Sequence, residues 1–413
     1  MQVRAWNRTL RCAHQEWIRS GKSEDARVAL QEVAKACTVV RREAREKYWK
    51  LFLDKIAATR SVKEVWNEVN KVRGVQRGVG LAGDSQKVAD DLIDKWAHSA
   101  SISSLPEAII TELRHHEGER NAFISACIGR RDSSCASITR EELLAGVTKG
   151  KSTAPGADGI SNDILNWLAS IEKGPLLDLF NMSFRLGRLP MKWKEAIIIP
   201  VPKGNGSYRP VSLTSCMCKM MERVILNRLL YLIGDNFSSN MYGFRKGKST
   251  SDCIISCLSN TKDECRVFVD LQGAFDKANG QIILYELGNL GVSGNMLGWI
   301  SNYLSNRYAR VWFGGKFSAL KHFELGTPQG GVLSPTLFNV LMNRIAKDEY
   351  PPDVMPIVYA DDILIQSPTV AKMQIALNKL CSNCTYLGLV VNEQKTKYQG
   401  RCHKSVTLTD IKW

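Results

Sequence analysis

Three aspartates beside apolar, strand-like runs are the residues of this 413-residue sequence best suited to bind metal. Asp270 follows the run 265–269, and Asp361 and Asp362 interrupt the run 356–365. Aspartates in a turn are usually solvated and structural, but carboxylates beside such apolar runs are costly to bury unless cations neutralise them. Three carboxylates on two adjacent strands can bind two divalent ions about 3.5–4 Å apart, which is the metal requirement of nucleotidyl transfer.

Short strands and turns are predicted to position these carboxylates. The run 265–269 predicts a buried strand that ends at Asp270, and the run 356–365 predicts a hairpin with the aspartate pair at its turn. Upstream, segments 196–203 and 208–213 flank a turn with two glycines. Strand ends are rigid positions, which suits metal ligands.

A turn and a helix are predicted between the two aspartate motifs. Ser334 and Pro335 suit the N-cap and first position of a helix, so Gln329 and Gly330 lie in the turn that leads into it. Further upstream, the glycines, proline and lysines of 149–160 leave little side chain between the backbone and an anion, which suits contact with phosphate. Such a loop alone is more often an ordinary turn.

These motifs, in this order, closely resemble the successive palm motifs of reverse transcriptases, most closely those of non-LTR (LINE-type), jockey-like retrotransposons. The resemblance rests on Asp270 with Phe275 and Asp276, on Gly-Thr-Pro-Gln-Gly-Gly-Val-Leu-Ser-Pro at 326–335, and on Tyr-Ala-Asp-Asp at 359–362. It extends from about residue 138 to residue 400, and several ordered motifs over so long a stretch make chance similarity improbable.

The resemblance implies an RNA-directed DNA polymerase core with two Mg²⁺ ions, for which Mn²⁺ can substitute, and with an RNA template, a DNA primer or target, and dNTPs as partners. The implied catalytic residues are Asp270, Asp361, Asp362 and Lys395, and the implied metal ligands are Asp270, Leu271, Asp361 and Asp362. The implied nucleotide-binding residues are Lys203, Arg209, Phe275, Gln329 and Gly330. The expected nucleic-acid contacts are Lys149, Lys151, Arg245, Lys246 and Lys248.

Two of these residues carry specific expectations. By the resemblance, the ring of Phe275 excludes a ribose 2′-hydroxyl, and this steric argument favours DNA synthesis. Lys395 either donates a proton to the pyrophosphate leaving group or is an exposed lysine without that role, and the sequence leaves both open. That the template is RNA follows from the resemblance alone.

The formal net charge of +15 requires a partner of opposite charge. Residues 1–80 hold 18 of the 56 basic and 9 of the 41 acidic residues, so this segment carries +9. Charge alone admits nucleic acid, an anionic membrane surface or an acidic protein, and polyanion binding is the first hypothesis. Because no apolar stretch approaches the roughly 18 residues of a membrane span and no signal peptide is recognisable, an intracellular location, in the nucleus or cytoplasm, is expected.

The 12 cysteines have no framework spacing, which predicts reduced thiols. Cys381 and Cys384, followed by Cys402 and His403, do not reproduce a known zinc-ligand spacing, so a zinc site is disfavoured.

The expected fold class is α+β, a right-hand polymerase with fingers, palm and a helical, basic N-terminal extension. The expected divisions are an extension and linker at 1–80, a fingers-containing region at 81–262, the palm at 263–400 and the start of a thumb connection at 401–413. Because little sequence follows the last palm motif at 388–397, we expect a truncated piece of a retrotransposon polyprotein with most of the thumb missing. The alternative function is a catalytically inactive nucleic-acid-binding remnant.

Helical periodicity predicts three helices in the first 150 residues. A basic amphipathic helix is expected over 38–58, and a short one around 88–96. Thr139 and Glu142 form the pattern of a capping box, which predicts a helix that ends before Gly150. The polar stretch between about residues 97 and 136 shows no clear pattern.

Overall fold

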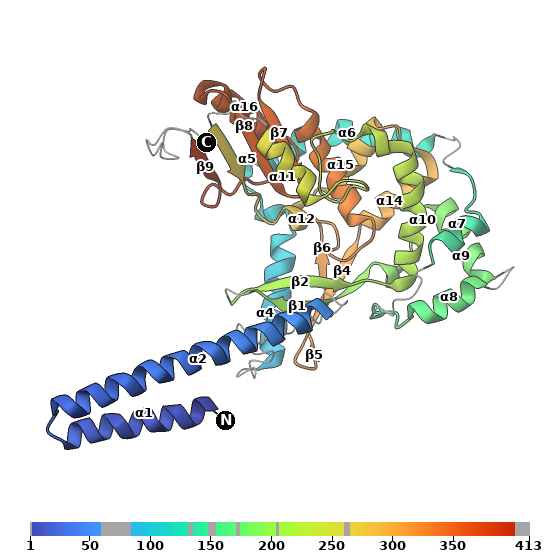
Figure 1. Ribbon diagram of the computed structural model, residues 1–413. Helices are drawn as coiled ribbons and strands as arrows, with labels where there is room; N and C mark the ends of the chain where they lie inside the picture. The colour runs from blue at the N-terminus through green and yellow to red at the C-terminus, as the bar shows by residue number, and fades with distance from the viewer. Residues whose placement is uncertain are drawn as a thin grey trace. The chain divides into compact units, whose positions relative to one another are not determined.

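The structure is a computed structural model that describes residues 2–58, 84–130, 135–147, 154–170, 174–203, 206–259 and 265–400 (Figure 1). The chain divides into two compact units, Met1–Ala82 and Gly83–Trp413. Residues 59–80 of the extension and linker expected at 1–80, and the thumb connection expected at 401–413, lie outside the described residues. Within the described part of the chain, no helix is both long enough and apolar enough to cross a lipid bilayer.

The first unit contains two helices that pack against each other, α1 (Gln2–Arg19) and α2 (Glu24–Ala58). Between them, the guanidinium of Arg41 donates a 2.6 Å hydrogen bond to the side-chain oxygen of Asn7. The sequence predicted this helix only from residue 38. Its first turn is acidic, with Glu24 and Asp25, and does not show the basic amphipathic pattern of residues 38–58. The side chains that defined its predicted apolar face, Trp49, Phe52, Leu53 and Ile56, lie outside the described set.

The second unit combines helices with two sheets, which agrees with the expected α+β class. Its longer helices are α4 (Ser85–Ser99), α5 (Glu107–His115), α6 (Glu117–Gly129), α8 (Asn162–Ser170), α9 (Pro175–Leu186), α10 (Cys216–Ile233), α11 (Thr250–Ser259), α13 (Gly280–Asn289), α14 (Gly294–Leu304), α15 (Ser334–Lys347) and α16 (Val370–Tyr386). Its shorter helices are α7 (Arg140–Ala145), α12 (Ala274–Lys277), η1 (Ile102–Ser104), η3 (Met191–Trp193) and η4 (Gly234–Asn236).

The first sheet has the strand order β2-β1-β4-β5, and β6 also pairs with β4. Its strands are β1 (Glu195–Pro202), β2 (Tyr208–Leu213), β4 (Arg307–Phe313), β5 (Lys316–Phe317) and β6 (Lys321–Phe323). The pairing of β1 with β2 is antiparallel and confirms the predicted upstream hairpin. The predicted helix at 88–96 is also confirmed, as α4, which buries Ile93 and Trp96 beside Val311 of β4.

The second sheet has the order β7-β8-β3-β9, and every neighbouring pair in it is antiparallel. Its strands are β3 (Cys265–Val269), β7 (Met355–Tyr359), β8 (Asp362–Ser367) and β9 (Lys397–Gly400). Both β3 and the β7–β8 hairpin were predicted from the apolar runs beside the aspartates, and both are confirmed. Helices α15 and α16 pack against β7 and β8 and exclude water from that side of the sheet (Figure 1).

The polar stretch between about residues 97 and 136, in which the sequence showed no clear pattern, contains helices α5 and α6. Each contributes to the main hydrophobic core, through Ile109 and Leu113 from α5 and Ile124 from α6. The buried residues of α5, Ile109, Ile110 and Leu113, fall at helical spacing, a signal that the sequence analysis missed. Helix α6 has only a weak apolar face, so its local sequence gives no such signal.

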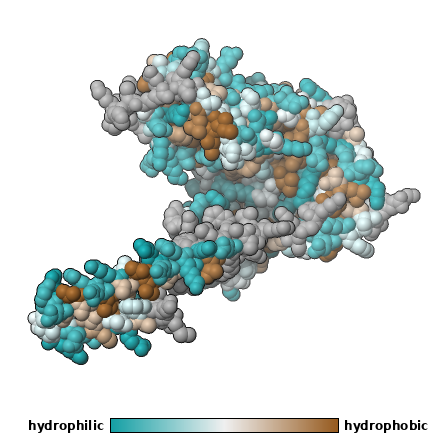
Figure 2. All heavy atoms as spheres, in the orientation of Figure 1, coloured by the Kyte–Doolittle hydropathy of each residue, from teal (hydrophilic) through white to brown (hydrophobic). Residues whose placement is uncertain are grey.

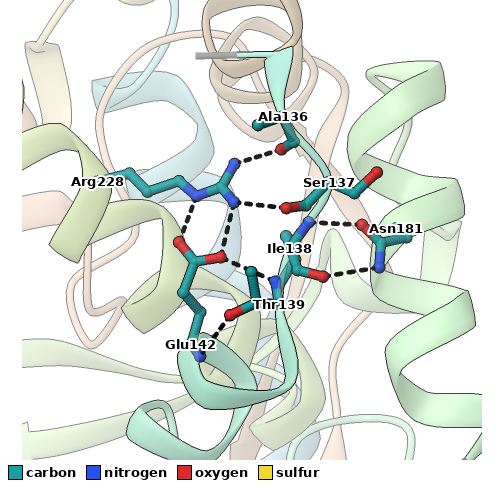
Figure 3. Close-up of polar contacts among 7 residues, drawn as sticks. All are labelled: Ala136, Ser137, Ile138, Thr139, Glu142, Asn181 and Arg228. Carbon is teal, nitrogen blue, oxygen red and sulfur yellow. Dashed lines mark hydrogen bonds and ion pairs between the residues drawn. The ribbon is translucent and has the colours of Figure 1, made fainter. Parts of the chain in front are cut away.

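The capping box predicted at Thr139 is present at the start of α7 (Figure 3). The hydroxyl of Thr139 accepts a hydrogen bond from the backbone N–H of Glu142 at 3.3 Å, and the Glu142 carboxylate accepts one from the N–H of Thr139 at 2.9 Å. Arg228 of α10 adds an ion pair to Glu142 at 2.6 Å and donates to the carbonyls of Ala136 and Ser137. One arginine thus joins α7, the segment before it and α10.

The N-terminus of α15 differs by one residue from the prediction. Leu333 is the N-cap, so Ser334 is the first helical residue and its hydroxyl donates instead to the carbonyl of Pro328 at 2.8 Å. The backbone N–H groups of Val332 and Leu333 donate to the buried carboxylate of Glu222 from α10. Glu222, far away in sequence, therefore binds the backbone immediately before the first helical residue, where a negative charge is favourable, and Leu333 makes no side-chain cap hydrogen bond.

Candidate active site

Strand pairing in the second sheet brings the three aspartates together. Val269, the last residue of β3, pairs with Ile363 of β8, so Asp270 and Asp362 occupy the next positions on neighbouring antiparallel strands. Tyr359 pairs with Asp362 at the end of the β7–β8 hairpin, which leaves Asp361 in a two-residue turn. Carboxylates from both sequence motifs thus lie at one end of the sheet.

The charges of these aspartates act on one another. Burial raises the pKa of Asp362, and the neighbouring carboxylates of Asp361 and Asp270 raise it further. Both effects disfavour the ionised form of the carboxylate, one through poor solvation and the other through like charge nearby. A divalent cation at this end of the sheet would relieve both.

Two residues from the segment after α16 hold Asp270. The side-chain amide of Asn392 donates a 3.0 Å hydrogen bond to its carboxylate, and the backbone N–H of Asn392 donates to its carbonyl at 2.8 Å. The ammonium of Lys395 is 3.9 Å from the same carboxylate, and its side chain is 70% exposed. Sequence reasoning missed Asn392. The signal was available, because Asn392 lies in the same motif as Lys395.

The donor set suits a hard cation such as Mg²⁺. Among the described residues, no three carboxylate, thiol or imidazole groups are arranged to hold one metal ion by themselves. Mg²⁺ rarely needs such a set, since it usually binds one or two carboxylates together with water and substrate phosphates. Asp270, Asp361 and Asp362 can supply these carboxylates, whereas Leu271 can supply only its backbone carbonyl.

Aromatic rings fix the side chain of Phe275. Its ring stacks on Phe338 of α15, with centroids 4.1 Å apart and planes inclined by 20°. The ring of Phe244 meets it edge-on, with centroids 6.0 Å apart. Phe338 is fully buried, so Phe275 rests on a rigid support and cannot easily turn away.

The predicted nucleotide-binding turn at Gln329 and Gly330 packs against the first sheet. The Gln329 side chain donates a 2.8 Å hydrogen bond to Asp276, and its carbonyl accepts one from the N–H of Ser212 in β2. Gly330 has a φ of +130°, and a Cβ there would lie 2.4 Å from the carbonyl oxygen of Ser212. Only glycine fits this close approach.

Asp276 is a second residue that sequence reasoning left without a role. Burial raises its pKa, which the hydrogen bond from Gln329 and the charges of Arg307 and Lys203 oppose. Arg307 is itself buried, and burial lowers its pKa to about 10. Asp276, Arg307 and Gln329 line a cavity of about 60 Å³ beside β1 and β2. Asp276 therefore links the turn at Gln329 to the cations of the first sheet.

The two hairpin cations lie at one end of the first sheet. Arg209 pairs with Val201 in the β1–β2 ladder, and Lys203 follows the end of β1. Both residues are exposed. The backbone N–H of Lys203 donates to the carbonyl of Ser207 at 2.7 Å, which closes the hairpin. Two exposed cationic side chains therefore lie at the hairpin end of the first sheet.

The expected nucleic-acid contacts differ in their surroundings. Arg245 bonds within its own loop, where its guanidinium donates to the carbonyl of Ser238 at 2.6 Å and lies 5.5 Å from the ring centroid of Phe237. Lys246 is exposed, and Lys248 lies 5.0 Å from the ring centroid of Tyr242. Lys149 and Lys151 lie outside the described residues.

A groove runs beside the aspartates. Its walls include Asp270, Asp362 and Lys395 together with Phe268 of β3 and Cys253 of α11. Apolar side chains are visible on the face of the second unit shown in Figure 2, and α11 itself exposes Ile254, Ile255 and Leu258. The walls of the groove thus combine acidic, basic and apolar side chains.

The chain is similar in sequence to known reverse transcriptases. Residues 201–405 match the family described as reverse transcriptase (RNA-dependent DNA polymerase). The chain is 30% identical over 269 residues to a probable RNA-directed DNA polymerase from transposon BS of Drosophila melanogaster, an alignment that covers 59% of this chain and 30% of that protein. It is 30% identical over 253 residues to the RNA-directed DNA polymerase from mobile element jockey of Drosophila melanogaster, covering 56% of this chain and 27% of the relative. The chain spans less than a third of the length of these two relatives.

Proposed function

This chain carries a reverse transcriptase domain of the non-LTR, LINE type, and from that premise we propose that it is the RNA-directed DNA polymerase core of a retrotransposon. The reaction would join the α-phosphate of a dNTP to the 3′-hydroxyl of a primer on an RNA template. The observation that carries this proposal is the pairing of Val269 with Ile363, which brings Asp270 beside Asp362.

Asp270, Asp361 and Asp362 are the proposed ligands of Mg²⁺. Two bound ions would activate the primer hydroxyl and stabilise the triphosphate and leaving group. Asn392 fixes one orientation of the Asp270 carboxylate through its 3.0 Å hydrogen bond. Lys395 is exposed enough to move from Asp270 toward a departing pyrophosphate, where it would act as the proton donor.

Phe275 is the proposed selector of deoxyribose. Its ring is held in place by Phe338, so it forms a wall that does not yield to a 2′-hydroxyl. A hydrophobic wall rejects an added hydroxyl strongly only when it also clashes with it, and a rigid support provides that clash. The chain would therefore incorporate dNTPs in preference to rNTPs.

Lys203 and Arg209 are the proposed contacts of the triphosphate. Both lie at the free end of the β1–β2 hairpin, and Arg209 has a planar guanidinium suited to paired hydrogen bonds with phosphate. Gln329 and Gly330 lie behind this hairpin, held against Ser212. We assign the hairpin to the fingers and the sheet of β3, β7, β8 and β9 to the palm.

The first unit is the proposed electrostatic contact with nucleic acid. Helices α1 and α2 carry most of the basic residues of the segment 1–80, whose charge is +9. Phosphate contacts by such residues release counterions and do not depend on base sequence. The proposed partners of the whole chain are thus RNA template, DNA primer and dNTPs.

Primer extension on an RNA template tests the proposed function. The unmodified chain with Mg²⁺ and dNTPs should extend a primer, and the variant Asp361→Asn should not. A chain that binds template and primer but extends nothing would instead support the alternative, an inactive nucleic-acid-binding remnant.

A further inference from the structure

The loop between α10 and α11 runs alongside the hairpin that carries the aspartate pair. The backbone N–H of Tyr242 donates a 2.9 Å hydrogen bond to the carbonyl of Val358 in β7, and the N–H of Val358 donates to the carbonyl of Asn240 at 2.9 Å. These two bonds extend the sheet beyond β7 by a short parallel bridge. The next residue of the loop, Gly243, therefore reaches the turn between β7 and β8.

Gly243 is in close contact with that turn. A Cβ at Gly243 would lie 2.4 Å from the backbone nitrogen of Ala360 and 3.1 Å from its Cα. These are backbone atoms, which cannot move aside without moving the turn. Ala360 has a φ of +57°, a left-handed conformation that residues other than glycine rarely adopt. The turn that carries Asp361 is thus held in a conformation that needs support from its surroundings.

Asn339 of α15 holds Gly243 in this position. Its side-chain amide donates a 2.9 Å hydrogen bond to the carbonyl of Gly243, and the residue is only 2% exposed. Its side-chain oxygen is buried and has no hydrogen-bond partner among the described residues. An unpaired buried acceptor lowers stability, so folding stability alone does not account for this side chain.

Asn343 lies one helical turn after Asn339 in α15 and also binds the loop between α10 and α11, so the two side chains can be compared. Its amide donates to the carbonyl of Asn236 at 3.1 Å, and its oxygen accepts from the N–H of Ser238 at 2.9 Å. It is also buried, at 5% exposure. Asn343 therefore anchors the start of the same loop, away from the aspartate turn, whereas Asn339 anchors the residue that touches it.

We propose that Asn339 and Gly243 are positioning residues for the turn that carries Asp361 and Asp362. Asn339 holds the backbone of Gly243 in place, and Gly243 prevents Ala360 from moving toward the loop. The aspartate pair consequently stays beside Asp270. This inference rests on the proposed metal-binding role of the three aspartates.

Binding of Mn²⁺ to the full chain, followed by electron paramagnetic resonance, tests this inference without requiring catalysis. We expect Asn339→Ala to weaken Mn²⁺ binding by about 10-fold or more and Asn343→Ala to change it by less than about twofold, since residues that orient ligands typically contribute 10–100-fold in metal affinity. Both variants lose a buried amide, so both should lower the melting temperature. Equal weakening in the two variants, or unchanged binding in Asn339→Ala, would overturn the proposal.

A second variant provides an independent test. Gly243→Ala leaves Asn339 intact but places a methyl group against Ala360, so it should reproduce the weaker Mn²⁺ binding of Asn339→Ala. Unchanged binding in Gly243→Ala would contradict the proposed contact. If Asn339→Ala does not fold, Asn339→Leu replaces it, because leucine fills the buried space without a donor.

The outcomes also separate this inference from the proposed function. An unmodified chain that binds Mn²⁺ with the expected order of variants but extends no primer would contradict the polymerase and leave the positioning roles standing. A chain that extends primers, with Mn²⁺ binding equal in all variants, would contradict the positioning roles alone.

Discussion

The ring of Phe275 lies parallel to that of Phe338, with centroids 4.1 Å apart, and this contact ties the proposed sugar selector to helix α15. Phe338 is fully buried, so the stacked pair forms a fixed surface. Phe244 also touches Phe275, but only edge-on and with its own side chain 53% exposed. The two contacts therefore differ in how firmly they hold the ring.

Shortening Phe275 should relax sugar discrimination. We expect Phe275→Val to raise the incorporation of rNTPs relative to dNTPs by about 10- to 100-fold, the range over which a pocket wall discriminates one group. Single-nucleotide incorporation with each sugar measures this ratio. Phe244→Val is the matched control, since it removes a ring of the same size that is not the proposed sugar selector. An unchanged ratio in Phe275→Val would be incompatible with the selector role.

Removing Lys395 should slow the chemical step. If Lys395 protonates the leaving pyrophosphate, Lys395→Ala should lower kcat by about 100-fold and leave the KM for dNTP nearly unchanged. Single-turnover kinetics separate the two constants. Lys397→Ala removes a nearby lysine of the same groove and should have little effect on kcat. Similar losses in both variants would favour the alternative that Lys395 is an exposed lysine without this role.

The Arg228 network should stabilise the protein in a pH-dependent way. Arg228→Met removes the ion pair to Glu142 and the bonds to Ala136 and Ser137, so we expect the free energy of unfolding to fall by about 1–2 kcal/mol at pH 7. Urea unfolding measures this loss. Arg223→Met is the control, because Arg223 of the same helix donates one hydrogen bond among the described residues, to the carbonyl of Gly146.

The sign of the pH dependence follows from Glu142. The hydrogen bond from Arg228 lowers the pKa of Glu142 below its ordinary value of 4.5. Its contribution to stability is therefore fully present above pH 4.5 and is lost as the pH falls through the lowered pKa. The difference between the unmodified chain and Arg228→Met should shrink in acid. A difference that grows as the pH falls would contradict this network.

Charge on α1 should control the salt dependence of template binding. Replacing the exposed residues Arg8, Arg11 and Arg19 by glutamine should reduce the slope of log affinity against log salt by about 2 to 3, if all three contact phosphate. Fluorescence anisotropy with labelled RNA over a salt series measures the slope. The same three residues changed to lysine keep the charge and should keep the slope. Identical slopes in all three proteins would exclude α1 from the interface.

The sequence was most informative where chemistry and local structure coincide. The apolar runs around Asp270 and around Asp361 predicted the strand and the hairpin, because period and turn residues are local signals. Thr139 and Glu142 predicted the start of α7 for the same reason. The register that pairs Val269 of β3 with Ile363 of β8 was not predicted, because it joins segments far apart in sequence.

Contacts between distant residues explain what the sequence did not reveal. The N-cap of α15 is Leu333 and not Ser334, and Glu222 of another helix binds the backbone N–H of Leu333. Asn392 binds Asp270 from a segment 122 residues later, and Asn339 reaches Gly243 across 96 residues. Such partners depend on how the elements pack, which the periodicity of one segment does not encode.

The most direct test of the central claim is extension of a DNA primer on an RNA template by the full chain with Mg²⁺ and dNTPs, beside Asp361→Asn. The substitution keeps the size of the side chain and removes one of the carboxylates that strand pairing gathers at the end of the sheet. We predict extension by the unmodified chain and its loss in Asp361→Asn, with template binding retained in both. Equal extension by the two proteins, or none by either, would contradict a polymerase site at Asp270, Asp361 and Asp362.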